Sequence, residues 1–157
     1  MKLNYREDID GLRAISVLVV LLNHAGIGLF SGGFIGVDVF FVISGYLITT
    51  IIVREIQSNE FSLTRFYERR IRRILPALMI VVAFTVAVCA IMYDAEKFRD
   101  FGKSVIATTL FASNINFWKE SGYFDAPSRL KPLLHTWSLA VEEQFYIFFP
   151  LFMVVLY

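Results

Sequence analysis

The sequence predicts an all-α membrane protein, built as a polytopic bundle of transmembrane helices. Hydrophobic residues make up 57% of the 157 residues, and aromatic residues make up 16%. Charged residues make up only 18%, whereas a typical soluble domain has about 25%. Because one span takes about 20 apolar residues, this length accommodates about four or five spans with their connections. The composition therefore excludes a soluble domain.

Five apolar segments follow one another without an internal repeat or a low-complexity linker, which predicts a single domain over residues 1–157. The third is free of charge and opens with Pro76, a residue tolerated in a first helical turn. The fourth is short and polar, so a buried or re-entrant helix is an alternative there. The fifth is still apolar at Tyr157 without a closing signal, and we therefore expect an incomplete domain from the front of a larger protein. The segments cover about residues 12–30, 34–53, 74–92, 104–118 and 138–157.

Lysine and arginine residues predict the orientation of these segments. Lys2, Arg6 and Arg13 precede the first segment, and several arginines crowd the connection between the second and the third. The link at residues 31–33 carries no positive charge. By the positive-inside rule, the N-terminus and the arginine-rich connection are cytoplasmic. The net charge of +1 excludes nucleic-acid binding by bulk charge.

Small residues predict how the helices pack. Gly32, Gly36 and Gly45 are expected to allow close helix approach, with a Gly32-x-x-x-Gly36 spacing found at helix contacts in membranes. Cys89 is the only cysteine and lies in an apolar run. It has no companion for an intrachain disulfide or a metal site, so a buried thiol is expected and no metal site is predicted.

His24 and Asp38 are ionisable residues within the first two segments, where a central charge costs about 2.5–3.5 kcal/mol. Along a helix, His24 lies roughly 16 Å beyond Arg13. A neutral imidazole at that depth suits a general base, or it is a structural histidine that is hydrogen-bonded to a neighbouring helix together with Asn23. Asp38 could approach His24 and orient its ring, or it is an acid favoured by the helix dipole.

Four arginines within five residues lie before the third segment: Arg69, Arg70, Arg72 and Arg73. On a helix they share faces at spacings of three and four residues. Their guanidinium groups match phosphate oxygens, so the cluster suits a ligand with several phosphates. The alternative is an interfacial amphipathic helix on anionic lipid, with aromatic side chains such as Phe66 in the headgroup layer.

Polar residues also precede the last apolar segment. Thr136 or Ser138 can cap a helix whose first turns carry Glu142 and Glu143. Acids near a helix start are favoured by its dipole, but an apolar span follows these two directly. They are therefore expected to face a polar cavity, whereas His135 is expected in a loop.

These stretches resemble the acyltransferase-3 family of membrane acyltransferases, in particular its bacterial branch similar to O-antigen acetyltransferases. They appear in family order from one end of the chain to the other. Members of this kind have about twice as many spans, so the resemblance covers the N-terminal part of such a domain. The matching stretches are residues 5–15, Asn23-His24-Ala25, 32–49, 66–77 and 135–146.

The resemblance implies a bacterial inner-membrane O-acyltransferase. Cytoplasmic acyl-CoA, commonly acetyl-CoA, would serve as a co-substrate, with no permanently bound cofactor. The acceptor would be a hydroxyl of a carbohydrate or lipid-linked glycan, such as lipopolysaccharide O-antigen. His24 and Arg13 match the catalytic pair of the family, and the arginine cluster at 69–73 matches its Arg-x-x-Arg motif, implied to contact CoA phosphates. Further pocket residues are expected at Asp38, Trp137, Ser138, Glu142 and Glu143.

Two versions of the chemistry remain open. In the first, His24 takes the proton from the acceptor hydroxyl as it attacks the thioester. In the second, His24 carries the acyl group covalently across the membrane. The rival class is a non-enzymatic membrane protein, a transporter subunit or an inactive interaction fragment, in which His24 and the acids form a proton or ion pathway. That class does not explain the dense arginine cluster.

Overall fold

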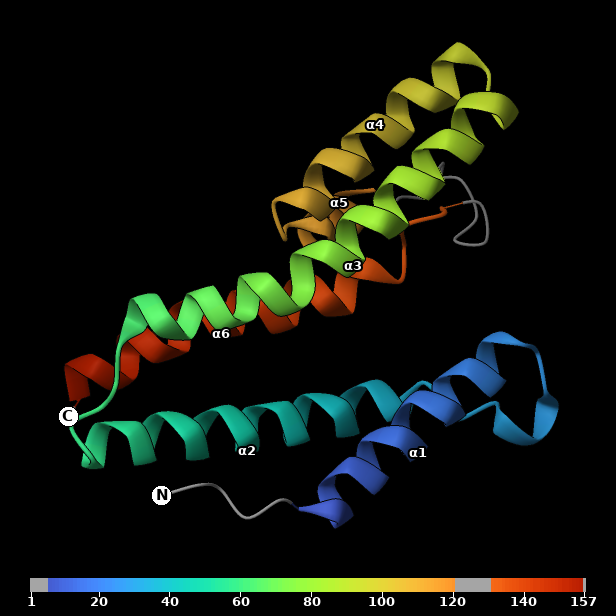
Figure 1. The fold of residues 1–157 in the computed structure, drawn as a ribbon. Coiled ribbons are helices and arrows are strands. Elements are labelled where there is room, and N and C mark those ends of the chain that lie inside the picture. Colours follow the sequence, from blue (N-terminus) through green and yellow to red (C-terminus); the bar gives the residue numbers. More distant parts are fainter. Residues whose placement is uncertain (1–5, 121–130, 157) are drawn as a thin grey trace. The chain divides into compact units, whose positions relative to one another are not determined.

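The computed structural model describes residues 6–120 and 131–156, and within them every regular element is helical (Figure 1). This confirms the all-α fold class of the sequence analysis. The described residues divide into two units, one ending at Ser58 and one starting at Asn59, and each is described by itself.

The first unit is a helical hairpin. Helix α1 (Glu7–His24) and helix α2 (Ile35–Gln57) pack side by side and are joined through the short 3-10 helix η1 (Gly28–Phe30). Helix α1 starts earlier than the predicted first segment. Its first turn carries three acids, which interact favourably with the helix dipole. It also stops at His24, short of the predicted end, because the chain turns at Gly26 with φ of 74°. His24 is thus the last residue of its helix.

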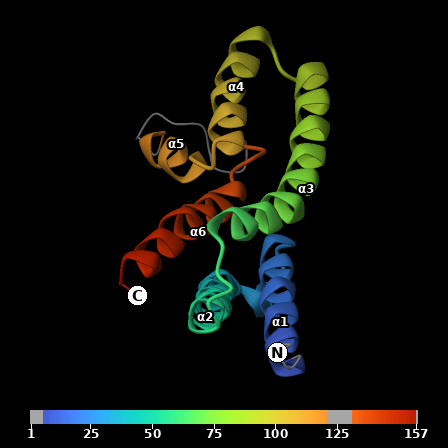
Figure 2. The same ribbon diagram turned by 60° about the vertical axis from the view of Figure 1, so that its left-hand side comes forward.

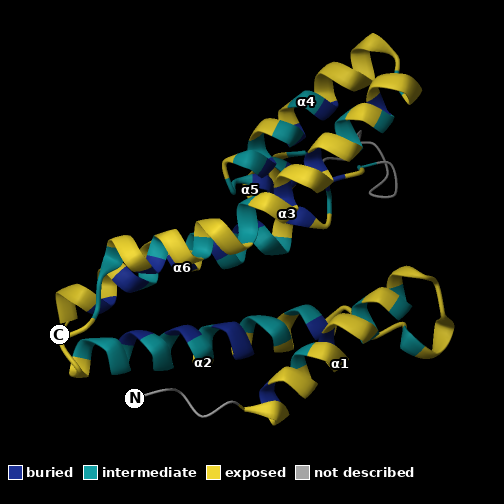
Figure 3. Ribbon diagram, in the orientation of Figure 1, coloured by how far each residue is buried: buried dark blue, intermediate teal, exposed yellow. Residues whose placement is uncertain are grey.

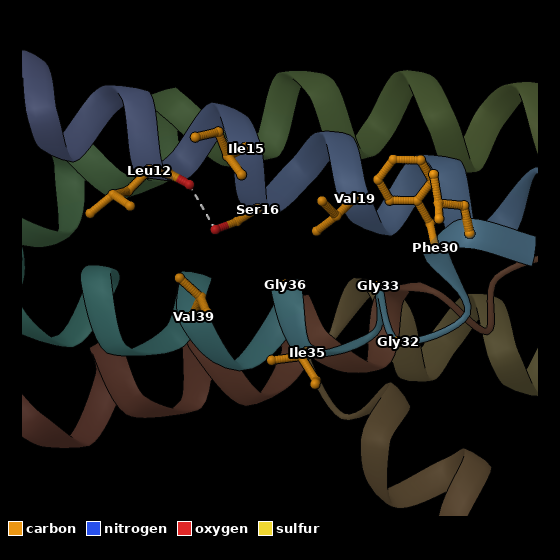
Figure 4. Close-up of a pocket in the computed structure, with 11 residues that line it drawn as sticks. Leu12, Ile15, Ser16, Val19, Phe30, Gly32, Gly33, Ile35, Gly36 and Val39 are labelled. Carbon is orange, nitrogen blue, oxygen red and sulfur yellow. Dashed lines mark hydrogen bonds between the residues drawn. The ribbon is translucent and has the colours of Figure 1, made fainter. Parts of the chain in front are cut away.

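Two glycines bring α1 and α2 together, as the close-up in Figure 4 shows. A Cβ atom on Gly36 would clash with the carbonyl oxygen of Ser16 and lie 2.9 Å from the Val19 side chain. One on Gly33 would clash with the carbonyl oxygen of Val19. The prediction for Gly36 is confirmed.

The predictions for Gly32 and Gly45 were wrong, because an added Cβ at either position meets nothing within 4 Å. The close contact uses Gly33 and Gly36, three residues apart, and not the four-residue spacing that the sequence suggested. The crossing of the two helices decides which glycines face the neighbouring backbone, and that crossing is not visible in the sequence.

The second unit begins with the longest helix, α3 (Leu63–Met92), which combines the arginine cluster and the predicted third segment. The hydroxyl of Ser62 caps it by accepting a hydrogen bond from the Arg65 amide at 3.4 Å. Pro76 therefore lies inside a continuous helix. The prediction that it opens a helix, in the first turn, was wrong. Its missing amide leaves the Arg72 carbonyl without its helical partner. Figure 2 shows α3 bending between its arginine-bearing turns and its apolar part.

The other helices of this unit are shorter or more polar. Among the described residues, three helices are long and apolar enough to cross a membrane: α2, α3 and α6. The single fourth span predicted near residues 104–118 was wrong. A helix already begins at Ala95 and carries charges in its first turns, and the chain then breaks at Phe111, where φ is 52°. The helices after α3 are α4 (Ala95–Thr109), α5 (Ser113–Lys119) and α6 (Thr136–Leu156).

The core of the second unit lies where these helices meet, as the burial pattern in Figure 3 shows. Cys89, Phe101, Phe117 and Leu133 form its apolar cluster. The thiol of Cys89 is buried there, as expected.

Gln144 links α6 to the break between α4 and α5. Its amide nitrogen donates to the Phe111 carbonyl at 2.8 Å and to the Asn114 side-chain oxygen at 3.0 Å. The Asn114 amide nitrogen donates back to the Gln144 oxygen at 3.1 Å. These bonds hold the backbone of Phe111 in its left-handed conformation.

Gln144→Leu is expected to lower the free energy of unfolding by about 1–3 kcal/mol, because it leaves the Phe111 carbonyl and the Asn114 amide without partners. Thermal unfolding in detergent measures the loss. Phe148→Leu, one turn along α6 at a residue that is 68% exposed, provides the matched control and should change stability little. Equal effects of the two substitutions would contradict this role of Gln144.

Acidification is expected to loosen the start of α4. Asp94 caps this helix, and its carboxylate accepts hydrogen bonds from the Lys97 amide and the Lys97 ammonium, each at 2.9 Å. These bonds hold the pKa of Asp94 below its usual range. Because the folded pKa is the lower one, the stabilisation is complete above the unfolded value of about 3.9 and disappears as the pH falls through the folded value.

The protection factors for amide hydrogen exchange in the first turn of α4 should therefore fall below about pH 4. Asp94→Asn keeps an uncharged cap and should lose this pH dependence. The same pH dependence in both proteins would show that Asp94 is not its source.

Candidate functional site

The imidazole of His24 is held by its own helix. Nδ1 lies 2.8 Å from the Val20 carbonyl oxygen, and because a carbonyl only accepts, Nδ1 is the donor. In the neutral ring, Nε2 then carries the lone pair and is free to accept a proton. The side chain is exposed at the end of α1. This arrangement suits a base or a nucleophile.

Asp38 does not orient this ring. It is exposed in the first turn of α2, and within residues 6–58 no hydrogen bond or ion pair joins it to His24. The Val20 carbonyl holds Nδ1 instead. A pocket role of Asp38 stays a prediction.

Asn23 supports the link that follows His24. With the amide assigned so that its nitrogen faces the link, this nitrogen donates to the Phe30 carbonyl at 3.1 Å and to the Ser31 carbonyl at 3.3 Å. Asn23 thus fixes the turn after α1, whereas the structural alternative had expected it to bond, together with His24, to a neighbouring helix.

Arg13 lies between α1 and α2. Its guanidinium carbon is 5.2 Å from the centroid of the Phe40 ring, and its Nη1 is 3.8 Å from a carboxylate oxygen of Asp10. Its Nε is buried and, among the described residues, has no hydrogen-bond partner. Phe40 and Asp10 therefore hold a guanidinium that still has a donor to offer.

A cavity of about 380 Å³ also lies on this hairpin, as Figure 4 shows. Its lining is apolar except for Ser16, whose hydroxyl donates to the Leu12 carbonyl at 2.7 Å. His24 and Arg13 do not line it. The cavity therefore does not unite the predicted site residues.

In the second unit, the structure divides the arginine cluster. Arg69, Arg72 and Arg73 are exposed, and Arg72 forms an ion pair with Glu68 at 2.7 Å. Arg70 is half-buried and turns toward α6, with its guanidinium carbon 4.7 Å from the centroid of the Tyr146 ring. The cluster thus offers three outward charges and one inward charge.

Aromatic rings hold Arg70 in place. Besides Tyr146, the ring of Phe66 lies 5.6 Å from its guanidinium carbon. Phe66 is buried, so the alternative that placed it in the lipid headgroups was wrong for this residue. Tyr67 adds a hydrogen bond from its hydroxyl to the Ile147 carbonyl at 2.7 Å. The sequence analysis missed the role of Tyr146; its signal was an aromatic residue three positions after a buried acid.

The two acids of α6 differ in their surroundings. Glu142 accepts a hydrogen bond from the Tyr146 hydroxyl. Glu143 is only 7% exposed, and its Oε1 has no hydrogen-bond partner among the described residues. It lies on the buried stripe of α6 that also contains Ala140 and Tyr146. A buried ionisable group inside an apolar helix is by default a candidate for a functional site, and a pocket role of Glu143 stays a prediction.

The start of α6 is polar, and the hydroxyl groups there already form hydrogen bonds within the protein. Thr136 is buried and its hydroxyl donates to the Leu133 carbonyl at 2.7 Å, while Ser138 donates to the His135 carbonyl at 3.2 Å. Both hydroxyls thus donate to preceding carbonyls. Trp137 is exposed. Pocket roles of Trp137 and Ser138 stay predictions. In the part of the chain that is described, no group of three or more His, Cys, Asp or Glu residues is placed to hold a metal ion.

Comparison with known proteins gives a consistent set of relatives. The acyltransferase domain model of the acyltransferase-3 family matches residues 6–157. A protein of Staphylococcus aureus strain MSSA476, provisionally named an O-acetyltransferase, is 42% identical in an alignment of 159 positions that covers 99% of this chain and 26% of the relative. A peptidoglycan O-acetyltransferase of Listeria monocytogenes is 39% identical in an alignment of 153 positions that covers 96% of this chain and 24% of the relative.

A Bacillus subtilis protein with a provisional peptidoglycan O-acetyltransferase name is 42% identical in an alignment of 154 positions, which again covers 96% of this chain and 24% of the relative. The chain thus spans about a quarter of the length of the curated relatives it matches. No solved structure matches it significantly.

Proposed function

The chain belongs to the acyltransferase-3 family, as its motifs predicted, and we propose that it forms the donor-side helices of a membrane O-acetyltransferase. The reaction moves an acetyl group from cytoplasmic acetyl-CoA to a hydroxyl of a cell-surface glycan. The observation that carries this proposal is the His24 ring, whose Nδ1 donates to Val20 and leaves Nε2 as a proton acceptor.

In this reaction His24 acts as the general base. Nε2 takes the proton of the acceptor hydroxyl while its oxygen attacks the thioester carbonyl carbon. The carbon–sulfur bond breaks, and the CoA thiolate leaves and takes the proton back from the imidazolium. His24 returns to its neutral form, and the acceptor carries an ester.

In the competing version, Nε2 itself attacks the thioester carbonyl carbon, the carbon–sulfur bond breaks and CoA leaves as its thiolate. The acceptor hydroxyl then attacks the acetyl carbon, the nitrogen–carbon bond breaks to restore the imidazole, and the hydroxyl proton passes to the thiolate or to water. A rapid quench during turnover with labelled acetyl-CoA separates the two versions. Label on the His24 peptide supports the covalent version, and an unlabelled protein supports the general base.

The arginines provide the positive charges that acetyl-CoA requires. Arg69, Arg72 and Arg73 are exposed and lie within about one turn of one another, so they suit its phosphates. Arg13 keeps a buried donor that suits the substrate or the histidine environment. By the positive-inside rule, these groups and the N-terminus lie at the cytoplasmic face of the plasma membrane.

The acceptor is a glycan hydroxyl. The sequence resemblance pointed to lipopolysaccharide O-antigen as one example, whereas the Listeria relative is named for peptidoglycan. Among glycans, that name favours peptidoglycan for this protein.

The test is transfer of radiolabelled acetyl from acetyl-CoA by membranes that contain the full-length gene product. Label released from the glycan fraction by mild alkali, and absent from membranes without the protein, is the expected result. Label in lipopolysaccharide and not in peptidoglycan would overturn the acceptor assignment. No label in either fraction, together with proton or solute transport, would favour the non-enzymatic class.

A further inference from the structure

We propose that Glu143 and Arg70 form a binding site for an amide group, and that this amide belongs to the pantetheine arm of the acyl donor. The inference rests on the proposed use of acyl-CoA. It assigns to Arg70 a role different from that of the three exposed arginines, and to Glu143 a ligand.

Glu143 supplies the acceptor of this site. Its side chain is more than nine-tenths buried on the face of α6 that contains Tyr146, and its Oε1 has no partner in the described residues. A buried carboxylate oxygen without a donor costs free energy, so it marks a position where a ligand donor fits. Glu142 is different, because the Tyr146 hydroxyl already donates to it.

Arg70 supplies the donors. The rings of Tyr146 and Phe66 hold its guanidinium at 4.7 and 5.6 Å from their centroids. Within the described residues, no hydrogen bond or ion pair joins Arg70 to Glu142 or Glu143. Glu143 lies three residues before Tyr146 on α6, and its carboxylate acts electrostatically on the Arg70 guanidinium. The guanidinium N–H groups and the free carboxylate oxygen thus offer a donor and an acceptor near each other. An amide, with one C=O and one N–H, is complementary to that pair.

The position of the site selects the pantetheine arm among amide-containing ligands. Arg69 and Arg73 lie within one helical turn of Arg70, so phosphates bound there would end close to the α6-facing side of α3. The pantetheine arm begins at those phosphates and contains amide groups along its length. If the exposed arginines hold the phosphates of acyl-CoA, its pantetheine arm would thus run past Glu143 between the phosphates and the thioester.

The test measures dissociation constants of acetyl-CoA analogues in which an ester oxygen replaces each amide N–H in turn. The full-length protein in lipid nanodiscs is compared with Glu143→Leu. In the native protein, one ester analogue should bind about 10- to 150-fold more weakly than acetyl-CoA, the usual effect of a hydrogen bond to a charged group. In Glu143→Leu, that analogue and acetyl-CoA should bind equally.

Two further variants keep the test decisive if Glu143→Leu fails to fold. Glu143→Gln keeps a neutral acceptor, so the penalty of the ester analogue should fall to about 2- to 12-fold. Glu142→Gln should keep the full penalty, because its carboxylate is already bound by Tyr146. An unchanged penalty in Glu143→Gln, or a native protein that tolerates every ester analogue, would overturn this site while leaving acetyl-CoA as the donor. A native protein that does not bind acetyl-CoA would remove the proposed function and this inference together.

Discussion

Replacing His24 by alanine is expected to reduce acetyl transfer by roughly 10²- to 10⁴-fold, the usual contribution of a general base. The KM for acetyl-CoA should change little, because the exposed arginines and not the imidazole are proposed to bind the phosphates. The reason is structural: Val20 fixes the ring so that Nε2 is the proton acceptor, and alanine offers none. Steady-state transfer by full-length protein in nanodiscs measures both constants.

The control for this result is chemical rescue. Added imidazole should restore part of the activity of the alanine variant, because it supplies the missing base within the space that the side chain leaves. The thermal stability should stay near that of the native protein, since the His24 side chain is exposed. Full activity in the variant would remove His24 from catalysis, and a loss of activity that imidazole does not restore and that accompanies unfolding would indicate a structural role.

Alanine at Gly33 or Gly36 is expected to separate α1 from α2. The added Cβ would clash with the carbonyl oxygen of Val19 or of Ser16, and backbone atoms cannot move aside as a flexible side chain can. Overpacking of this kind costs about 1–3 kcal/mol or more. Thermal unfolding in detergent should show the loss, and it should be larger than that of any surface substitution.

Gly45→Ala provides the matched control for these two substitutions. Gly45 lies within α2, but an added Cβ there meets nothing within 4 Å. Alanine has the higher helix propensity, so this variant should be more stable by about 0.5–1 kcal/mol. The opposite signs at Gly36 and Gly45 are the result to look for. Equal destabilisation at both would show that glycine is needed for flexibility and not for close approach.

The sequence predicted the parts of this structure that depend on residue type alone. An excess of apolar residues predicted membrane helices, and ionisable residues within or beside apolar runs singled out four candidates: His24, Asp38, Glu142 and Glu143. The burial of Cys89 followed from its apolar neighbours. Each of these depends on the cost of moving polar groups out of water, which is a local property of the chain.

The parts that the sequence analysis missed depend on how the helices cross. Gly33 and not Gly32 faces α1, because the crossing of the two helices selects one register. Arg70 differs from its three neighbours only because Tyr146 of α6 lies beside it. The break at Phe111 is held by Gln144, a residue that follows it by 33 positions. Such partners are set by tertiary packing, and spacing along one helix does not identify them.

Photolabelling with an acetyl-CoA analogue that carries a diazirine in its acyl group tests the central claim most directly. The full-length protein is irradiated with and without excess acetyl-CoA, and the labelled residues are located by mass spectrometry. We expect label on α1 close to His24, and we expect acetyl-CoA to suppress it. Label that acetyl-CoA suppresses but that lies nowhere on α1 would contradict the proposal that the acyl group is transferred at His24.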